Sequence, residues 1–453
     1  MGLAGGDNGP KAVLKRECAS AFCEVDTLLE LRQNFRVERC QMLAILDGNV
    51  ILRGLPSGVE SFHEAIEFFA WKIIDALRAA EHCVVVFDDS AVITQAKAKE
   101  QAKRDAAAKR RVPICSEDLT PYVIPTNDDY DMGALLQDKF SAPHLMATAR
   151  AARPRFIDAV VQGVLAMVER LVGEPFTLAF DGVDSRGAAR PVGEARVGGV
   201  FATHAVWETV LARRTPIGEG DMKFSAVCQG VRDVIEFGEA GILSNVCLYA
   251  LITVDTDSYM IELLEQSRRK VRVRETGVHE WVVLCMTERA RKRKGDDHVT
   301  PGHLLACDVE VLYELLVQRL FGTTRLGEAT AARVPEAIML LVAAFCLAGT
   351  DFVKLAGVRA DLALNAVATM IKRPGATDDL SYVLSPTPAG ALRAAVAIQR
   401  FLDHYVKSIE SNGRLTKSRQ NASAYSHADI SKTIFNVSYW AGNEHLDVSA
   451  FGF

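Results

Sequence analysis

Three short apolar runs share one pattern along the chain, and each of them leads into an aspartate. They are MLAIL (42–46) before Asp47, CVVVF (83–87) before Asp88 and VCLYALITV (246–254) before Asp255. Each run has the length of a strand, is rich in aliphatic residues and lacks polar alternation, which is typical of a strand buried on both faces. We therefore predict three core β-strands that end at acidic residues.

Helical periodicity is found between these predicted strands. The segments FHEAIEFFAWKIIDALRAA (62–80) and RFIDAVVQGVLAMVERLV (155–172) each place apolar side chains on one stripe. Strands that alternate with helices predict an α/β fold with a mostly parallel twisted central sheet flanked by helices. Ligands of such sheets bind at the carboxyl ends of the strands, where the three aspartates stand.

Composition narrows the choice of partners and location. The chain has 453 residues, of which 49% are hydrophobic, and its net charge is −5. A uniformly basic surface is therefore excluded, so a polyanion would have to be bound by local patches or by metal ions.

The ten cysteines form no CxxC pair, and several lie in apolar runs, Cys247 among them. We expect buried reduced thiols, a cytoplasmic or nuclear location, no secretion signal and no membrane partner. The oligomeric state is open.

Further acidic residues fall at glycine-rich turns and near predicted helix ends. GEGD (218–221) places Glu219 and Asp221 before an apolar-periodic helix, and CLAGTDF (346–352) places Asp351 after one, with Gly349 loosening the backbone. DTD (255–257) adds Asp257, which we expect to face the same side as Asp255 on an extended segment. A purely structural explanation is open too, because acidic side chains interact favourably with the N–H groups at helix starts.

These positions together predict a metal site. The set consists of seven carboxylates: Asp47, Asp88, Glu219, Asp221, Asp255, Asp257 and Asp351. Carboxylates gathered in one pocket repel each other unless cations neutralise them, and hard oxygen ligands suit Mg²⁺ or Mn²⁺. Two such ions about 3.5–4 Å apart can promote phosphodiester cleavage. No cysteine–histidine spacing predicts a zinc site, and no glycine-rich nucleotide-binding loop is present.

One basic stretch fits the same picture. In TQAKAKEQAKRDAAAKRR (94–111), Lys97, Gln101 and Arg104 have the spacing of one helix face. Ammonium, amide and guanidinium groups together suit a terminal phosphate. Alone, such a helix is more often solvated, but its place soon after Asp88 favours a phosphate pocket. The clusters SRRKVRVRE (267–275) and ERARKRKGDD (288–297) are interpreted as solvated faces or loops, with a nucleic-acid contact as the alternative.

The order of these motifs resembles that of the XRN family of 5′→3′ exoribonucleases, within the superfamily of flap endonucleases and PIN-like nucleases. The matching pieces are the initial MG, LDGN (46–49), VFD (86–88), the K-x3-Q-x2-R set, FSAPHLM (140–146), GEGDMK (218–223), DTD (255–257) and AGTDF (348–352). The resemblance covers about residues 1–355. It implies a nuclease core there, with an insertion around 173–215. Beyond it, the segments RADLALNAVATMIKR and GALRAAVAIQRFLDHYVKSI predict that the region 356–453 is mainly helical.

The resemblance also implies chemistry. The seven acids would bind two Mg²⁺ or Mn²⁺ ions, and Lys97, Gln101 and Arg104 would bind the 5′-monophosphate of an RNA that is degraded to mononucleotides. The chain departs from the family at Asp221, where a glutamate is usual, and at Arg53, where a histidine normally stacks on a base.

Two other functions are open. The segment KLAGVRADLALNAV (354–367) faintly resembles the helix-turn-helix with which flap endonucleases bind duplex DNA, so a structure-specific 5′ DNA nuclease is one alternative. A catalytically inactive, nuclease-derived binding protein is the other, and lost acidic residues would be its sign. Since all seven acids are present, we expect an active nuclease, and the resemblance implies that it acts on RNA rather than DNA.

Overall fold

The chain folds into two compact units. The computed structural model describes residues 9–34, 40–55, 62–87, 164, 168, 176–181, 193–196, 200–202, 205–212, 220–276, 279–287, 291–292, 299–300, 304–323, 325–350, 355, 357–372, 388–410 and 425–441. The helical unit comprises Met1–Glu24, Asp255–Met286 and Leu305–Phe453, and the sheet unit comprises Val25–Val254 and Thr287–Leu304. The end of the nuclease core at residue 355 is predicted from the resemblance to a family. The division into two units does not test it, so this domain boundary stays a prediction.

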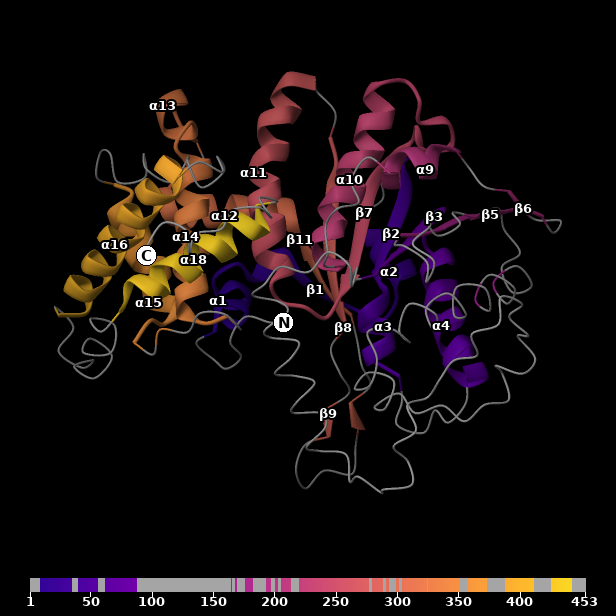
Figure 1. Ribbon diagram of the computed structural model, residues 1–453, viewed down its shortest axis with the longest axis horizontal. Coiled ribbons are helices and arrows are strands. Elements are labelled where there is room, and N and C mark those ends of the chain that lie inside the picture. The colour runs from indigo at the N-terminus through magenta and orange to yellow at the C-terminus, as the bar shows by residue number, and fades with distance from the viewer. Residues whose placement is uncertain are drawn as a thin grey trace. The chain divides into compact units, whose positions relative to one another are not determined.

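The sheet unit is built on a mostly parallel sheet, which confirms the α/β class. Its strands are β2 (Gln41–Asp47), β3 (His82–Val86), β4 (Phe176–Phe180), β5 (Gly193–Arg196), β6 (Val200–Ala202) and β7 (Val246–Thr253). They lie in the order β7-β2-β3-β4-β5-β6 (Figure 1). β2 pairs in parallel with β3 and β7, and β3 pairs in parallel with β4. β5 and β6 continue antiparallel beyond β4, and a separate hairpin joins β9 (Arg291–Lys292) to β10 (Val299–Thr300).

The strand order reverses beside β2. The chain goes from β2 to β3 and on to β4, and then returns to the other side of β2 as β7. In open parallel sheets, the carboxyl ends of the strands on either side of such a reversal form the usual ligand-binding crevice. The fold therefore gives the carboxyl end of β2 a special position.

The three predicted strands are confirmed, but β4 is not among them. Its run FTLAF is buried throughout and pairs with β3 from His82↔Thr177 to Val85↔Phe180. The region 173–215, which we expect to be an insertion, thus contributes a core strand to the sheet.

Helices cover this sheet. They are α2 (Leu28–Asn34), α3 (Gly48–Arg53), α4 (Phe62–Leu77), α9 (Ala205–Ala212) and α10 (Gly220–Glu236), with the short 3-10 helix η2 (Gly241–Leu243) before β7. The predicted stripe of α4 is buried at Ala65, Ile66, Phe69 and Ile73. Along the predicted helix 155–172, the described residues 164 and 168 are helical and buried.

A disulfide corrects one expectation about the cysteines. Cys40 and Cys247 are bonded, with their Cα atoms 5.7 Å apart. They stand next to the pair Gln41↔Val246, where β2 and β7 begin side by side. The expectation of a reduced thiol is wrong for Cys247, because two cysteines 207 residues apart in sequence meet only through strand pairing.

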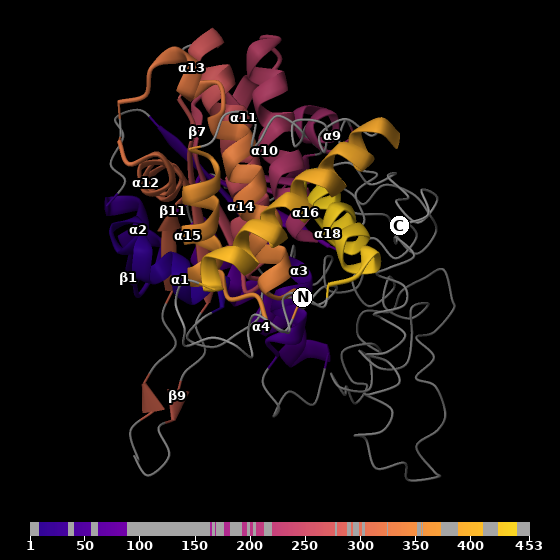
Figure 2. The same ribbon diagram turned by 90° about the vertical axis from the view of Figure 1, so that its left-hand side faces the viewer.

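The helical unit is organised around one apolar helix. Its strands β1 (Phe22–Val25), β11 (Leu304–Asp308) and β8 (Trp281–Thr287) lie in that order. Its helices are α1 (Pro10–Glu17), η1 (Ala19–Ala21), α11 (Ser258–Thr276), α12 (Val309–Phe321), α13 (Glu328–Ala331), α14 (Val334–Ala348), α15 (Ala360–Met370), α16 (Pro388–Glu410) and α18 (His427–Trp440). α14 contacts α11, α12, α15, α16 and α18, and Figure 2 shows it among them.

The apolar character of α14 follows from this position. Every side chain from Ala337 to Leu347 is buried, as expected for a helix that is hydrophobic all round. The segment Glu328–Ala348 is long and apolar enough to cross a membrane, but 72% of its most apolar window is buried inside the protein. The core helix of a globular protein passes the same test, so this segment is weak evidence for a membrane span.

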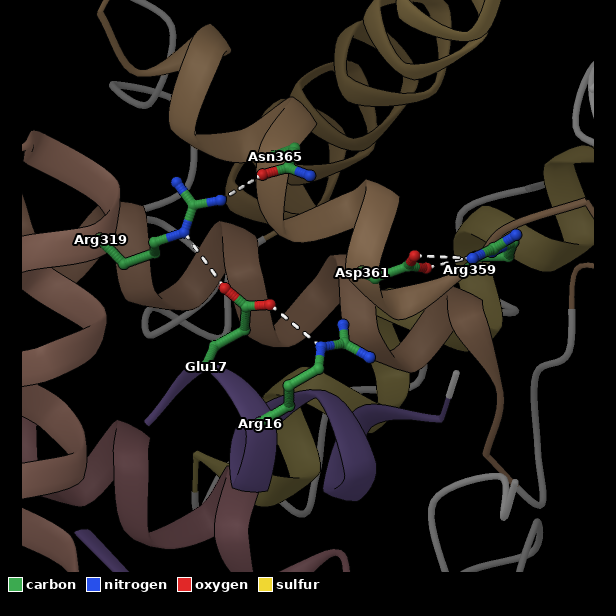
Figure 3. Close-up of polar contacts among 6 residues, drawn as sticks. All are labelled: Arg16, Glu17, Arg319, Arg359, Asp361 and Asn365. Atoms are coloured by element: carbon green, nitrogen blue, oxygen red, sulfur yellow. Dashed lines mark hydrogen bonds and ion pairs between the residues drawn. The ribbon is translucent and has the colours of Figure 1, made fainter. Parts of the chain in front are cut away.

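At the surface, an ion pair connects α1 to α12, and a hydrogen bond connects α12 to α15. Glu17 accepts hydrogen bonds from Arg16 and from Arg319, whose guanidinium also donates to Asn365 at 2.6 Å (Figure 3). Exposed pairs of this kind contribute about 0–1 kcal/mol each. Their role is to fix contacts that apolar packing already favours.

Gly48 generates a testable prediction about packing at the carboxyl end of β2. A Cβ atom at this position would lie 2.2 Å from Cε1 of Phe87, whose ring is buried and stacks on Phe69. We expect Gly48→Ala to lower the free energy of unfolding by about 1–3 kcal/mol, because overpacking forces side chains to shift. Chemical denaturation measures the change. Gly327→Ala is the control, because its Cβ would meet open space, and an equal loss in both variants would contradict the packing explanation.

Candidate functional site

Asp47 ends β2 at the reversal of strand order. It pairs with Val86 of β3, while the preceding Leu46 pairs with Ile252 of β7. Its side chain is buried, and Oδ1 accepts hydrogen bonds from the N–H groups of Asn49 at 2.9 Å and Val50 at 3.1 Å. These donors belong to the first turn of α3, so the start of that helix stabilises a negative charge at this edge of the sheet.

Several predicted site residues lie outside the described part of the chain. They are Asp88, Glu219, Asp351, Lys97, Gln101 and Arg104. The structure does describe the residues that lead to Asp88, namely strand β3 and the buried Phe87. The 5′-phosphate pocket therefore stays a prediction.

The first turn of α10 is held at the same edge of the sheet. α10 begins at Gly220, as predicted, so Asp221 stands in its first turn. Two residues later, Lys223 places Nζ 2.6 Å from Oδ2 of Asp181, and both side chains are 3% exposed. Asp181 directly follows β4, and its N–H donates to the carbonyl of Val85 in β3. The pair therefore connects the start of α10 to the carboxyl ends of β3 and β4.

Neither member of this ion pair is among the site residues predicted from the sequence. Asp181 follows FTLAF in the same way that Asp47 follows MLAIL, so the pattern of an apolar run leading into an aspartate would have identified it. Lys223 belongs to the GEGDMK motif, but a lysine near a helix start looks like an ordinary surface residue, so its burial and its partner could not be predicted.

In the helical unit, the backbone at DTD differs from the expected extended segment. Residues 256 and 257 form a turn that leads into α11, and the N–H of Asp257 donates to Oδ1 of Asp255 at 3.3 Å. The expectation that the two side chains face one side of an extended segment is therefore wrong. Asp257 is 2% exposed, and its carbonyl accepts from the N–H groups of Met260 and Ile261 at the start of α11.

A buried polar cluster lies at the end of α14, just before Asp351. Gly349 ends the helix with a φ of 146°, a backbone conformation that favours glycine, and Thr350 is buried. The amide nitrogen of Asn436 in α18 lies 3.3 Å from Sγ of Cys346 and 3.2 Å from Oγ1 of Thr350. Burial raises the pKa of the Cys346 thiol to about 12, Asn436 and Thr350 oppose the rise, and the Asp257 carboxylate adds to it. The start of α11 and the end of α14 thus lie close together.

The described side chains do not by themselves form a metal site. Among them, no group of three or more histidine, cysteine or acidic residues could hold a metal ion. The sheet unit carries Asp47 and the backbone of Asp221, and the helical unit carries Asp255 and Asp257. The gathering of all seven acids around two cations stays a prediction.

The interpretation of SRRKVRVRE as a solvated face is wrong for Arg269, which lies in α11 and is buried. Arg268 in the same helix is exposed, as expected, and Lys270 is partly buried. Arg269 is 2% exposed and donates to Glu262 at 2.7 Å. Arg268 donates to Glu265 and to the carbonyl of Ala441, and Lys270 pairs with glutamates of α12. These contacts make the segment part of the packing of the helical unit.

The segment after Asp351 bears on the alternative of a duplex-binding helix-turn-helix. Its second helix is α15, which follows a turn at Gly357. Arg359, just before α15, donates to both carboxylate oxygens of Asp361 at 3.1 and 2.7 Å (Figure 3). A guanidinium held in this way is less available for a DNA phosphate.

Comparisons with known proteins add no family. The chain matches no protein-family model, and a search of curated protein sequences gives no significant match.

The capping role of Asp47 leads to a prediction about stability. Asp47→Asn keeps an oxygen that can accept from the N–H groups of Asn49 and Val50, so we expect its free energy of unfolding to stay within about 1 kcal/mol of the original. Asp47→Ala loses the cap and should cost about 1–2 kcal/mol more. Chemical denaturation of both variants measures the difference, and equal stability would show that the cap does not matter.

Proposed function

We propose that the chain is a Mg²⁺-dependent nuclease with a PIN-like core, and specifically a 5′→3′ exoribonuclease acting on 5′-monophosphorylated single-stranded RNA. One observation carries most weight. Within the sheet unit, a buried aspartate ends the strand at the reversal of strand order, and the first turn of α10, which contains Asp221, is held at the same edge. Two parts of the predicted acidic set that are far apart in sequence, Asp47 and the helix start with Asp221, thus belong to one edge of a parallel sheet.

The donor chemistry of the described residues fits divalent cations. Asp47 and Asp257 are buried carboxylates, and buried carboxylates require hydrogen bonds, opposite charges or metal ions. When bound, two Mg²⁺ or Mn²⁺ ions would activate the attacking water and stabilise the leaving oxygen. In this proposal all seven acids supply oxygen ligands, and the start of α3 fixes the orientation of the Asp47 carboxylate through two N–H groups.

The choice of RNA and of a 5′ end rests on the resemblance in motif order. Lys97, Gln101 and Arg104 are proposed to bind the terminal phosphate, so that the chain is shortened from that end. A protein of this activity would act in the cytoplasm or the nucleus. The alternatives are a 5′ flap DNA nuclease and an inactive binding protein, and the experiment below distinguishes them.

The test is hydrolysis of labelled single-stranded RNAs that carry a 5′-monophosphate, a triphosphate or a hydroxyl, with matched single-stranded DNA and a DNA flap. We expect mononucleotides from the monophosphorylated RNA in Mg²⁺ and no hydrolysis in excess chelator. Lys97→Ala should reduce the preference for the monophosphate by about tenfold or more, because a hydrogen bond to a charged group contributes about 1.5–3 kcal/mol.

Other outcomes would contradict parts of the proposal. Equal rates on all three 5′ ends would exclude the phosphate pocket. Cleavage of the flap with little action on single-stranded RNA would favour the DNA nuclease. No hydrolysis of any substrate in Mg²⁺ or Mn²⁺ would favour the inactive binding protein.

Removal of a proposed ligand should separate activity from folding. We expect Asp255→Asn or Asp257→Asn to lower kcat on the order of a hundred- to a thousandfold, because transition-state charge stabilisation is lost. Circular dichroism should show the folded protein in each variant. Glu314→Gln is the control, since this half-exposed carboxylate of the same unit is paired with Lys270 and is not a proposed ligand. Unchanged kcat in both aspartate variants would exclude these residues from the site.

A further inference from the structure

The buried ion pair between Asp181 and Lys223 is unusual for its position. Its atoms lie 2.6 Å apart, and both side chains are 3% exposed. The transfer of two charges out of water costs several kcal/mol per ion, and apolar residues of similar volume in their place are often neutral or stabilising. Stability alone therefore gives little reason for this pair.

The place of Lys223 within its helix adds a second cost. α10 begins at Gly220, so Lys223 lies in the first turn. The start of a helix carries a partial positive charge, which favours acidic side chains there and disfavours an ammonium group. A residue that departs from such a local preference without an evident gain in stability is typical of a functional site.

The contacts around the ion pair show which elements of the sheet unit it holds in place. Asp181 is held by its backbone at the end of β4, where its N–H donates to Val85. The same strand also anchors α9, because Nε1 of the buried Trp207 donates to Oγ1 of Thr177. α9 in turn packs against α10 at Gly230, where a Cβ atom would lie 2.7 Å from the carbonyl oxygen of Val210. β4 thus determines where α10 lies and how its first turn is oriented.

We propose that Asp181 and Lys223 are positioning residues that hold the first turn of α10, to which Asp221 belongs, at the edge of the sheet where the proposed divalent cations bind. This inference rests on the proposed function. Lys223 binds no metal itself; its Nζ is the fixed point from which the helix start is held. The geometry on which the inference depends is the ion pair, the described backbone of α10 from Gly220 and the end of β4.

Metal affinity distinguishes this role from two others. If Lys223 only contributed charge, Lys223→Met would remove a cation from an acidic site and strengthen Mn²⁺ binding. If the pair only stabilised the fold, affinity measured well below the melting temperature would not change. A positioning role predicts weaker binding, since residues that orient metal ligands typically contribute about 10–100-fold in affinity.

The experiment is titration of the full-length protein with Mn²⁺, followed by electron paramagnetic resonance, with Mg²⁺ as competitor. We expect Lys223→Met to weaken Mn²⁺ binding at least tenfold. The double variant Asp181→Asn with Lys223→Met removes both charges of this pair together, so it should fold even if the single variant does not, and it should show the same loss. The control is Arg32→Met, which removes the ion pair with Glu81 beside the start of β3, and its affinity should be unchanged.

The outcomes of this titration distinguish failure of the positioning role from failure of the nuclease proposal. Binding by the folded double variant that is as tight as, or tighter than, that of the original protein would overturn the positioning role and leave the nuclease proposal intact. An original protein that binds no Mn²⁺ and hydrolyses no substrate would overturn both.

Discussion

The parallel pairing of β2 with β3 on one side and with β7 on the other is the constraint on which the rest of the sheet unit depends. Because all three strands point the same way, their carboxyl ends lie at one edge, and the reversal of strand order places β2 between the other two. The side chain at the end of β2 is therefore enclosed by its neighbours. Asp47 can be buried there because the first turn of α3 supplies two N–H groups to its carboxylate.

The two aspartates that end β2 and β4 illustrate different ways to bury a charge. Asp47 accepts hydrogen bonds from backbone N–H groups that the following helix leaves unused. Asp181 is instead neutralised by Lys223, which comes from a helix that starts some forty residues later. The first arrangement is local and forms wherever a strand turns directly into a helix. The second joins two distant segments and therefore constrains the tertiary structure.

Structural features that depend on residues close together in the sequence could be predicted. The apolar runs at 42–46, 83–87 and 246–254 are strands, the stripe of α4 is buried, α10 starts at GEGD and Gly349 ends α14. Features that depend on distant partners could not be predicted. Cys40 meets Cys247 only through the register of β2 and β7, and Arg269 is buried only because Glu262 and the packing of α11 neutralise and enclose it.

The turn at DTD shows a further limit of reasoning from spacing. Two aspartates separated by one residue share a face only if the backbone is extended, and the sequence alone does not exclude a turn. Here the Asp255 carboxylate competes for the backbone and accepts from the N–H of Asp257, which favours a turn and the start of α11. The same chemistry that makes aspartate a metal ligand thus also determines the local fold.

An acidic residue at a helix start can have a structural role and a functional role at the same time. Asp47, Asp221 and Asp257 stand at the starts of α3, α10 and α11. Backbone N–H groups at these positions lower the cost of placing negative charge in a buried region, which is the condition for gathering several carboxylates in one protein. The structural explanation therefore supports the functional one. Lys223 is the exception among these helix starts, and its buried cation is best explained by the contact that it makes with the end of β4.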